Sequence, residues 1–189
     1  MRKWMTLLLL VLCSQAGAQS VERLYEEGKA LYDAKKYTEA VKKLQPAAEK
    51  GHKKAQYRIG RCYDKGRGVK EDDKKAFEWY SKSAAQNYAK AQYEVGKCYK
   101  NGEGTAKNIA KAVEFFTKAA KQDNGDAQLA LGKCYMKGKG VAADPAKAKN
   151  LLMKAVNNKK DGKEIIAKLK KDAKEGDDDA VAILKIVGK

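Results

Sequence analysis

The chain has 189 residues, which suits one domain or one array of small repeats and is ample for a buried core. Its composition, 43% hydrophobic and 34% charged, excludes a wholly disordered chain, and its two prolines favour helices over a turn-rich sandwich. A single histidine excludes a His-rich metal site, while the formal charge of +17 indicates anionic partners.

Residues 1–18 have the three parts of a secretory signal peptide. Arg2 and Lys3 supply a positive start, residues 7–12 an apolar run, and the residues ending at Ala18 a small-x-small cleavage site. The run is far shorter than the roughly 20 residues of a transmembrane helix, and no later segment is apolar enough to span a bilayer. We therefore expect cleavage after Ala18 and export to a periplasm or out of the cell.

A period of 36 residues runs from Ala55 to Val156. Each unit reads as one helix, at about 55–65 in the first unit, that ends in Gly-x-Gly, and a second helix at about 73–85. Ten positions are identical in all three units, and in the first unit they are Ala55, Gln56, Gly60, Cys62, Tyr63, Gly66, Gly68, Lys75, Ala76 and Lys82. One helix pair cannot bury its apolar stripe alone, so the repeat predicts stacked pairs, with Gly60 allowing the two helices to approach closely.

The motifs of this unit resemble a known repeat. They read Ala-Gln-Tyr-x-x-Gly-x-x-Tyr from residue 55, then Gly-x-Gly-Val, then Lys-Ala-x-x-Trp-Tyr-x-x-x-Ala. This pattern is similar to the Sel-one-like repeat, a subclass of the tetratricopeptide-repeat superfamily. The resemblance implies an all-α fold, a right-handed tetratricopeptide-like solenoid of helix pairs.

The resemblance divides the chain into five parts after the signal peptide. A shorter tetratricopeptide-like repeat without the Gly-x-Gly insert comes first, three Sel-one-like repeats follow, and two divergent helices form a cap. The expected bounds are about 22–50, then about 51–84, 85–120 and 121–156, then 157–189.

Three cysteines recur at one point of the repeat, at Cys62, Cys98 and Cys134. Equivalent points in stacked helices lie roughly 10 Å apart, too far for a disulfide, so we interpret them as packing residues. An unpaired reactive thiol is the alternative. Some secreted relatives have a disulfide within each helix pair, but here the second helix has no cysteine. Lipidation at Cys13 is disfavoured because the preceding Leu12 is not small.

The sequence contains no recognisable catalytic constellation. The Gly-x-Gly turns lack the context of a phosphate-binding loop, no Cys-x-x-Cys motif suggests a metal, and His52 stands in a turn that we expect to be solvated. Some relatives have been described as hydrolases of β-lactams, yet Ser-x-x-Lys does not occur. We therefore expect no catalytic residues, no metal and no cofactor.

A surface is the strongest functional candidate. In tetratricopeptide folds, the first helix of each pair lines a concave groove, and the resemblance places three rows of side chains there. The first row contains Tyr25, Tyr57, Tyr93 and Leu129; the second Lys29, Arg61, Lys97 and Lys133; the third Tyr32, Asp64, Lys100 and Met136. Cations beside aromatic faces suit an acidic extended peptide or protein tail.

The sequence thus predicts an exported, noncatalytic scaffold or adaptor that binds a protein or acidic peptide, and we expect a monomer. The alternatives are a cell-envelope or β-lactam hydrolase-like enzyme, and an electrostatic binder of envelope polyanions. Without any nucleic-acid motif, no specific nucleic-acid partner is expected. Ordinary solvated residues of a lysine-rich protein would also explain the basic row.

Overall fold

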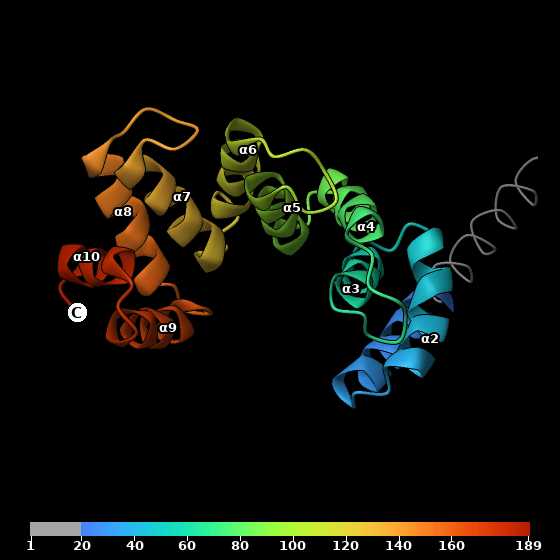
Figure 1. The fold of residues 1–189 in the computed structure, drawn as a ribbon. Helices are drawn as coiled ribbons and strands as arrows, with labels where there is room; N and C mark the ends of the chain where they lie inside the picture. The colour runs from blue at the N-terminus through green and yellow to red at the C-terminus, as the bar shows by residue number, and fades with distance from the viewer. Residues whose placement is uncertain (1–19) are drawn as a thin grey trace, which may run out of the picture. The chain divides into compact units, whose positions relative to one another are not determined.

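The structure, a computed structural model, describes residues 20–189, which form helices joined by turns, with no strand among them (Figure 1). The described residues divide into two compact units, 20–86 and 87–189. The predicted signal peptide, residues 1–18, lies outside the described residues. The prediction of an all-α fold is confirmed for the described part of the chain.

The first unit contains a helix over residues 20–33 and three further helices. These are α2 (Tyr37–Glu49), α3 (Lys53–Asp64) and α4 (Asp73–Ala85). α3 packs against both α2 and α4. Leu44 of α2 and Ile59 of α3 belong to one buried cluster, and Trp79 of α4 packs against it, so one core joins these helices.

The second unit contains three helix pairs. They are α5 (Ala89–Asn101) with α6 (Ile109–Ala120), α7 (Gly125–Lys137) with α8 (Pro145–Val156), and α9 (Gly162–Lys174) with α10 (Asp178–Val187). α7 packs against both α6 and α8, and α10 packs against α8 and α9 (Figure 1). The buried residues Phe116, Leu152 and Ile183 lie in this layer of packed helices.

Glycine at the centre of the first helix lets each pair approach closely, as predicted. A Cβ placed on Gly60 would lie 2.5 Å from Cδ1 of Tyr80, and one on Gly96 would lie 2.6 Å from Cδ1 of Phe116. Real Cβ atoms essentially never come so close to a neighbour, so any side chain would force the helices apart.

The second helix of each repeat begins in the same way. Asp72, Asn108 and Asp144 are the N-caps of α4, α6 and α8, and each side chain accepts a hydrogen bond from the backbone N–H three residues later at 2.9 Å. The hydrogen bond from that N–H is the main reason why the pKa values of Asp72 and Asp144 lie below the ordinary range.

The residue three positions after each of these N-caps is the lysine that recurs in every unit. Its ammonium lies over a tyrosine of the preceding helix, and the distance to the ring centroid is between 5.3 and 5.6 Å. The pairs are Lys75 with Tyr63, Lys111 with Tyr99, and Lys147 with Tyr135. These recurrent lysines therefore tie the two helices of a repeat together.

Candidate binding surfaces

Arginines gather around one tyrosine in the first unit. The guanidinium carbons of Arg58 and Arg61 lie 5.1 and 5.9 Å from the centroid of the Tyr32 ring. Nη1 of Arg67 donates a hydrogen bond to the Tyr32 hydroxyl at 2.9 Å, and this bond is the main cause that raises the pKa of Arg67. α3 and the loop after it thus hold three cations on one buried aromatic ring.

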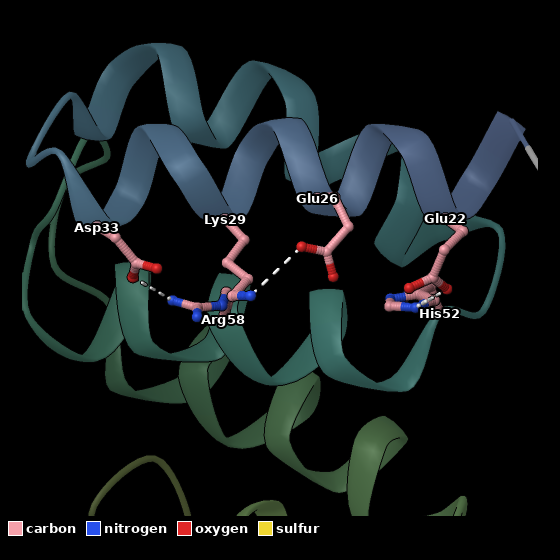
Figure 2. A network of polar contacts seen from close by, with 6 residues as sticks. All are labelled: Glu22, Glu26, Lys29, Asp33, His52 and Arg58. Carbon is pink, nitrogen blue, oxygen red and sulfur yellow. Dashed lines mark hydrogen bonds and ion pairs between the residues drawn. The ribbon is translucent and has the colours of Figure 1, made fainter.

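The N-terminal helix brings carboxylates to this basic surface (Figure 2). Asp33 accepts from Nη1 of Arg58 at 3.3 Å, and Glu26 accepts from Nζ of Lys29 at 3.3 Å. Figure 2 shows Lys29 between these two acids on the helix face that looks toward α3. The predicted basic row is therefore partly neutralised at its first member.

Tyr25, which the sequence analysis placed in the groove, is only 5% exposed. The centroid of the His52 ring lies 4.3 Å from the centroid of the Tyr25 ring. Nζ of Lys54 lies 5.7 Å from the centroid of the Tyr25 ring. Tyr25 therefore acts mainly as a packing residue of the first unit.

His52 differs from the expectation of a solvated turn residue. Its Nδ1 accepts from the backbone N–H of Ala55 at 3.2 Å, which caps α3, and its Nε2 lies 3.1 Å from Glu22. Its side chain is 15% exposed, so its role is structural.

In the second unit, Tyr93 and Lys97 lie together on α5. Nζ of Lys97 is 5.6 Å from the centroid of the Tyr93 ring and donates to a Glu94 carboxylate oxygen at 2.7 Å. The Tyr93 ring also lies 5.8 Å from the Phe116 ring, as Tyr57 does from Tyr80 in the first unit. Both tyrosines are half-buried, so each contributes part of one face to the surface.

Lys133 lines a hollow of about 630 Å³, which we call the basic hollow. α5, α7 and the loops that follow them supply most of its wall, α6 contributes Ile109, and α10 contributes Asp179. Its lysines are Lys100, Lys107, Lys133 and Lys139. Asp179 forms an ion pair with Lys137, and this pair offsets part of the negative charge of Asp179. The hollow therefore has an excess of positive charge.

Lys107 and Lys139 of the basic hollow were not among the predicted site residues. They lie in the loops after the first helix of two successive repeats, outside the helix positions from which the groove was inferred. The lysines of the inserted Gly-x-Gly loops were the signal that could have identified them.

Cys62, Cys98 and Cys134 are all buried, which fits their interpretation as packing residues, and they are free cysteines in the described part of the chain. Burial raises the pKa of the Cys62 thiol to about 11, although Arg61 and Arg58 act in the opposite direction. Burial likewise raises the pKa of Cys134. Thiols in such surroundings are protonated at neutral pH and react slowly.

Within residues 20–189, no group of three His, Cys, Asp or Glu side chains is arranged to hold a metal ion. In the same range, no helix combines the length and the apolar character needed to cross a membrane.

The Sel1 repeat model matches residues 53–88, 89–124 and 125–159, which contain the helix pairs α3–α4, α5–α6 and α7–α8. The chain belongs to the Sel1 repeat family. This is the Sel-one-like repeat that the sequence motifs resemble, so that prediction and the helical-repeat solenoid fold are confirmed.

Solved structures agree with this family. A Sel1 repeat protein from Oxalobacter formigenes is 34% identical, with 72% of this chain and 56% of that protein covered and a TM-score of 0.69. A protective antigen of uropathogenic Escherichia coli with an SLR fold is 26% identical, with 95% of this chain and 40% of that protein covered and a TM-score of 0.73. Cysteine-rich protein B of Helicobacter pylori shares the fold. It is 22% identical, with 79% of this chain and 95% of that protein covered and a TM-score of 0.52.

A search of the curated proteins finds no match. This chain spans 56% and 40% of the first two solved relatives, so their complete architectures are larger than the part compared. Sel1 repeat relatives are generally noncatalytic scaffolds, and the family indicates a role in protein–protein interaction.

Proposed function

We propose that the chain is an exported, noncatalytic scaffold that binds an acidic segment of a partner protein through the first helices of its repeats. In the first unit the binding residues are Tyr57 and Arg61, with Lys29 at the margin. In the second unit they are Tyr93, Lys97 and Lys133, together with the remaining lysines of the basic hollow.

The basic hollow is the observation that carries this proposal. Four lysines line it and one carboxylate, Asp179, is engaged by Lys137. Positive charge held in a concavity attracts carboxylates from a distance and strengthens their ion pairs once water is partly displaced. Ile109 and Ala130 add apolar area to the wall, which favours a peptide over a bare polyanion.

Affinity capture from a cell-envelope extract, followed by mass spectrometry, tests the proposal. The bait is compared with a triple variant, Arg61→Glu, Lys97→Glu and Lys133→Glu. A matched control reverses Lys82, Lys118 and Lys149 instead, which are exposed on second helices and give the same change in net charge. A partner should be retained by the control and lost by the triple variant.

Salt separates this proposal from binding to envelope polyanions. A polyanion binder should lose affinity steeply as salt rises and should be weakened equally by both triple variants, because it senses mainly net charge. A peptide bound in the basic hollow should keep part of its affinity at high salt. Turnover of a β-lactam by the purified protein, abolished by one substitution, would contradict the noncatalytic assignment.

Export rests on residues 1–18 and has its own test. N-terminal sequencing of protein from the envelope fraction should give Gln19 as the first residue. Recovery of the uncleaved chain from the cytosol would contradict it. The proposed division into a first repeat at about 22–50 and a cap at 157–189 is tested by truncation at these bounds.

A further inference from the structure

A second cleft, of about 900 Å³, lies over α7 between α6 and α8, entirely within the second unit. We call it the α7 cleft. Leu131 and Leu151 supply apolar wall, and Lys121, Lys154 and Lys159 bring positive charge. It shares no lining residue with the basic hollow. Its volume lies within the roughly 300–1,000 Å³ of typical ligand sites.

One pair of glutamine amides, an exposed donor on a buried acceptor, recurs in the repeats that precede this cleft. Nε2 of Gln86 donates to Oε1 of Gln56 at 2.8 Å, and Nε2 of Gln122 donates to Oε1 of Gln92 at 2.7 Å. The two pairs lie 36 residues apart, so they occupy the same place in successive repeats. Each bond satisfies an acceptor that would otherwise be buried without a partner.

The third repeat breaks this pattern at the cleft. The residue 36 positions after Gln122 is Asn158, whose side chain is one methylene shorter. Its Nδ2 donates to the backbone oxygen of Asp123 at 3.0 Å and to Oδ1 of Asp123 at 3.1 Å. Gln122 makes the equivalent bond to Oδ1 of Asn87 at 3.1 Å, so Asn158 keeps that contact but does not donate to Gln128 as Gln122 does to Gln92.

Gln128 is consequently left with an unused acceptor. Its Nε2 donates to Oδ1 of Asp123 at 3.0 Å, but its Oε1 is buried and has no hydrogen-bond partner. Gln128 is 3% exposed and lines the α7 cleft. A buried acceptor without a donor costs about 1–3 kcal/mol, so a bound group that supplies one gains affinity.

We propose that the α7 cleft binds an acidic segment of a partner protein that donates an N–H to Oε1 of Gln128. Such a segment combines the three groups that the cleft requires: a donor, carboxylates for the lysines and an apolar side chain for Leu131 and Leu151. Asp123 is the only carboxylate among the lining residues, and two amide donors already engage it. Lys147, which also lines the cleft, is paired with Asp144, but Lys121, Lys154 and Lys159 outnumber Asp123, so the cleft has an excess of positive charge.

The site goes beyond the proposed function, because it lies on different side chains from the basic hollow. Isothermal titration calorimetry with the peptide acetyl-Asp-Leu-Asp-Leu-Asp-amide tests it. The wild-type chain should bind this peptide, and it should bind the Asn-Leu-Asn-Leu-Asn analogue at least about tenfold more weakly, since the ion pairs with the lysines are lost. No binding of the acidic peptide would overturn the proposal.

Two variants locate the peptide. Asn158→Gln restores the side chain of the earlier repeats, and by occupying Oε1 of Gln128 it should weaken binding about tenfold without changing any charge. This variant gives up the bonds that Asn158 Oδ1 accepts from two backbone N–H groups, so its folding is checked by thermal melting. Lys154→Glu, at an exposed position, should weaken binding about fivefold even where Asn158→Gln fails to fold.

Lys82→Glu is the matched control, because Lys82 occupies the position of Lys154 two repeats earlier, in the first unit. It should leave peptide affinity within about twofold. Equal weakening by Lys82→Glu and Lys154→Glu would show an effect of net charge and overturn the proposal. Loss of binding in Lys133→Glu, with Asn158→Gln unaffected, would place the peptide in the basic hollow: the α7 cleft would be rejected and the proposed function would stand.

Discussion

The Lys97 ammonium lies 5.6 Å from the centroid of the Tyr93 ring, one helical turn earlier on α5, while it also donates to Glu94 at 2.7 Å. One cation thus interacts with both an aromatic face and a carboxylate of its own helix. A carboxylate from a partner must compete with Glu94 for this ammonium.

Removal of that competition should strengthen binding. Glu94→Gln keeps the shape of the side chain and removes its charge, so the captured partner should bind about two- to fivefold more tightly. Calorimetry with the purified partner measures this. Glu114→Gln, at an exposed position on α6, is the control and should change little. Weaker binding in Glu94→Gln would show that Lys97 is not part of the binding surface.

Close approach of the helices should make Gly96 intolerant of any side chain. The new Cβ in Gly96→Ala would lie 2.6 Å from the Phe116 ring, and overpacking of this kind costs about 1–3 kcal/mol. The better helix propensity of alanine returns up to about 1 kcal/mol, so a net loss is expected. Chemical denaturation measures it, with Lys118→Ala on the exposed face of α6 as a control expected within about 0.5 kcal/mol. Equal stability of Gly96→Ala and wild type would contradict the packing account.

Burial should protect the Cys62 thiol. Its pKa of about 11 is above the ordinary value of about 8.5, so at pH 8 almost no thiolate is present and alkylation should be slow. Iodoacetamide labelling followed by peptide mass spectrometry should show little modification of Cys62 in the native protein and full modification in denaturant. Labelling of native Cys62 as fast as in denaturant would instead indicate the reactive thiol considered from the sequence.

The N-cap Asp144 should make the stability of the folded chain depend on pH in the acidic range. Its folded pKa is lowered, first by the N–H of Lys147, so its charge contributes stability in full above the ordinary carboxyl pKa of about 3.9. That contribution is lost as the pH falls through the lower folded pKa. Asp144→Ala should therefore lower the thermal midpoint at neutral pH, and the difference from wild type should shrink in acid. Asp144→Asn, which keeps a cap acceptor, should lie between the two, and a pH-independent difference would contradict this.

Much of the fold could be predicted from the sequence because the same pattern of residues occurs in three successive units. The period, the two helices of each unit and the close contact at Gly60 follow from spacing and from the absence of a Cβ. Helix starts could be placed only to within about two residues, because the caps at Asp72 and His52 depend on local hydrogen bonds. The stacking of His52 on Tyr25 required knowledge of how α3 packs on the preceding helix.

The candidate sites were less accessible from the sequence. Helix positions in the repeat led to Lys97 and Lys133, but the loop lysines Lys107 and Lys139 come from segments whose path is set by tertiary packing. The unused acceptor of Gln128 is invisible at its own position, where all three repeats are identical. Its signal is the change from Gln122 to Asn158, and the consequence of one missing methylene appears only in the hydrogen bonds.

The affinity of the captured partner for the triple variant Arg61→Glu, Lys97→Glu and Lys133→Glu tests the central claim most directly. We expect a loss of at least about tenfold by calorimetry at physiological salt, because the ion pairs with the partner's acids become repulsions. The control with Lys82, Lys118 and Lys149 reversed should stay within about twofold of wild type. Unchanged affinity of the triple variant, or an equal loss in the control, would contradict binding through the first helices of the repeats.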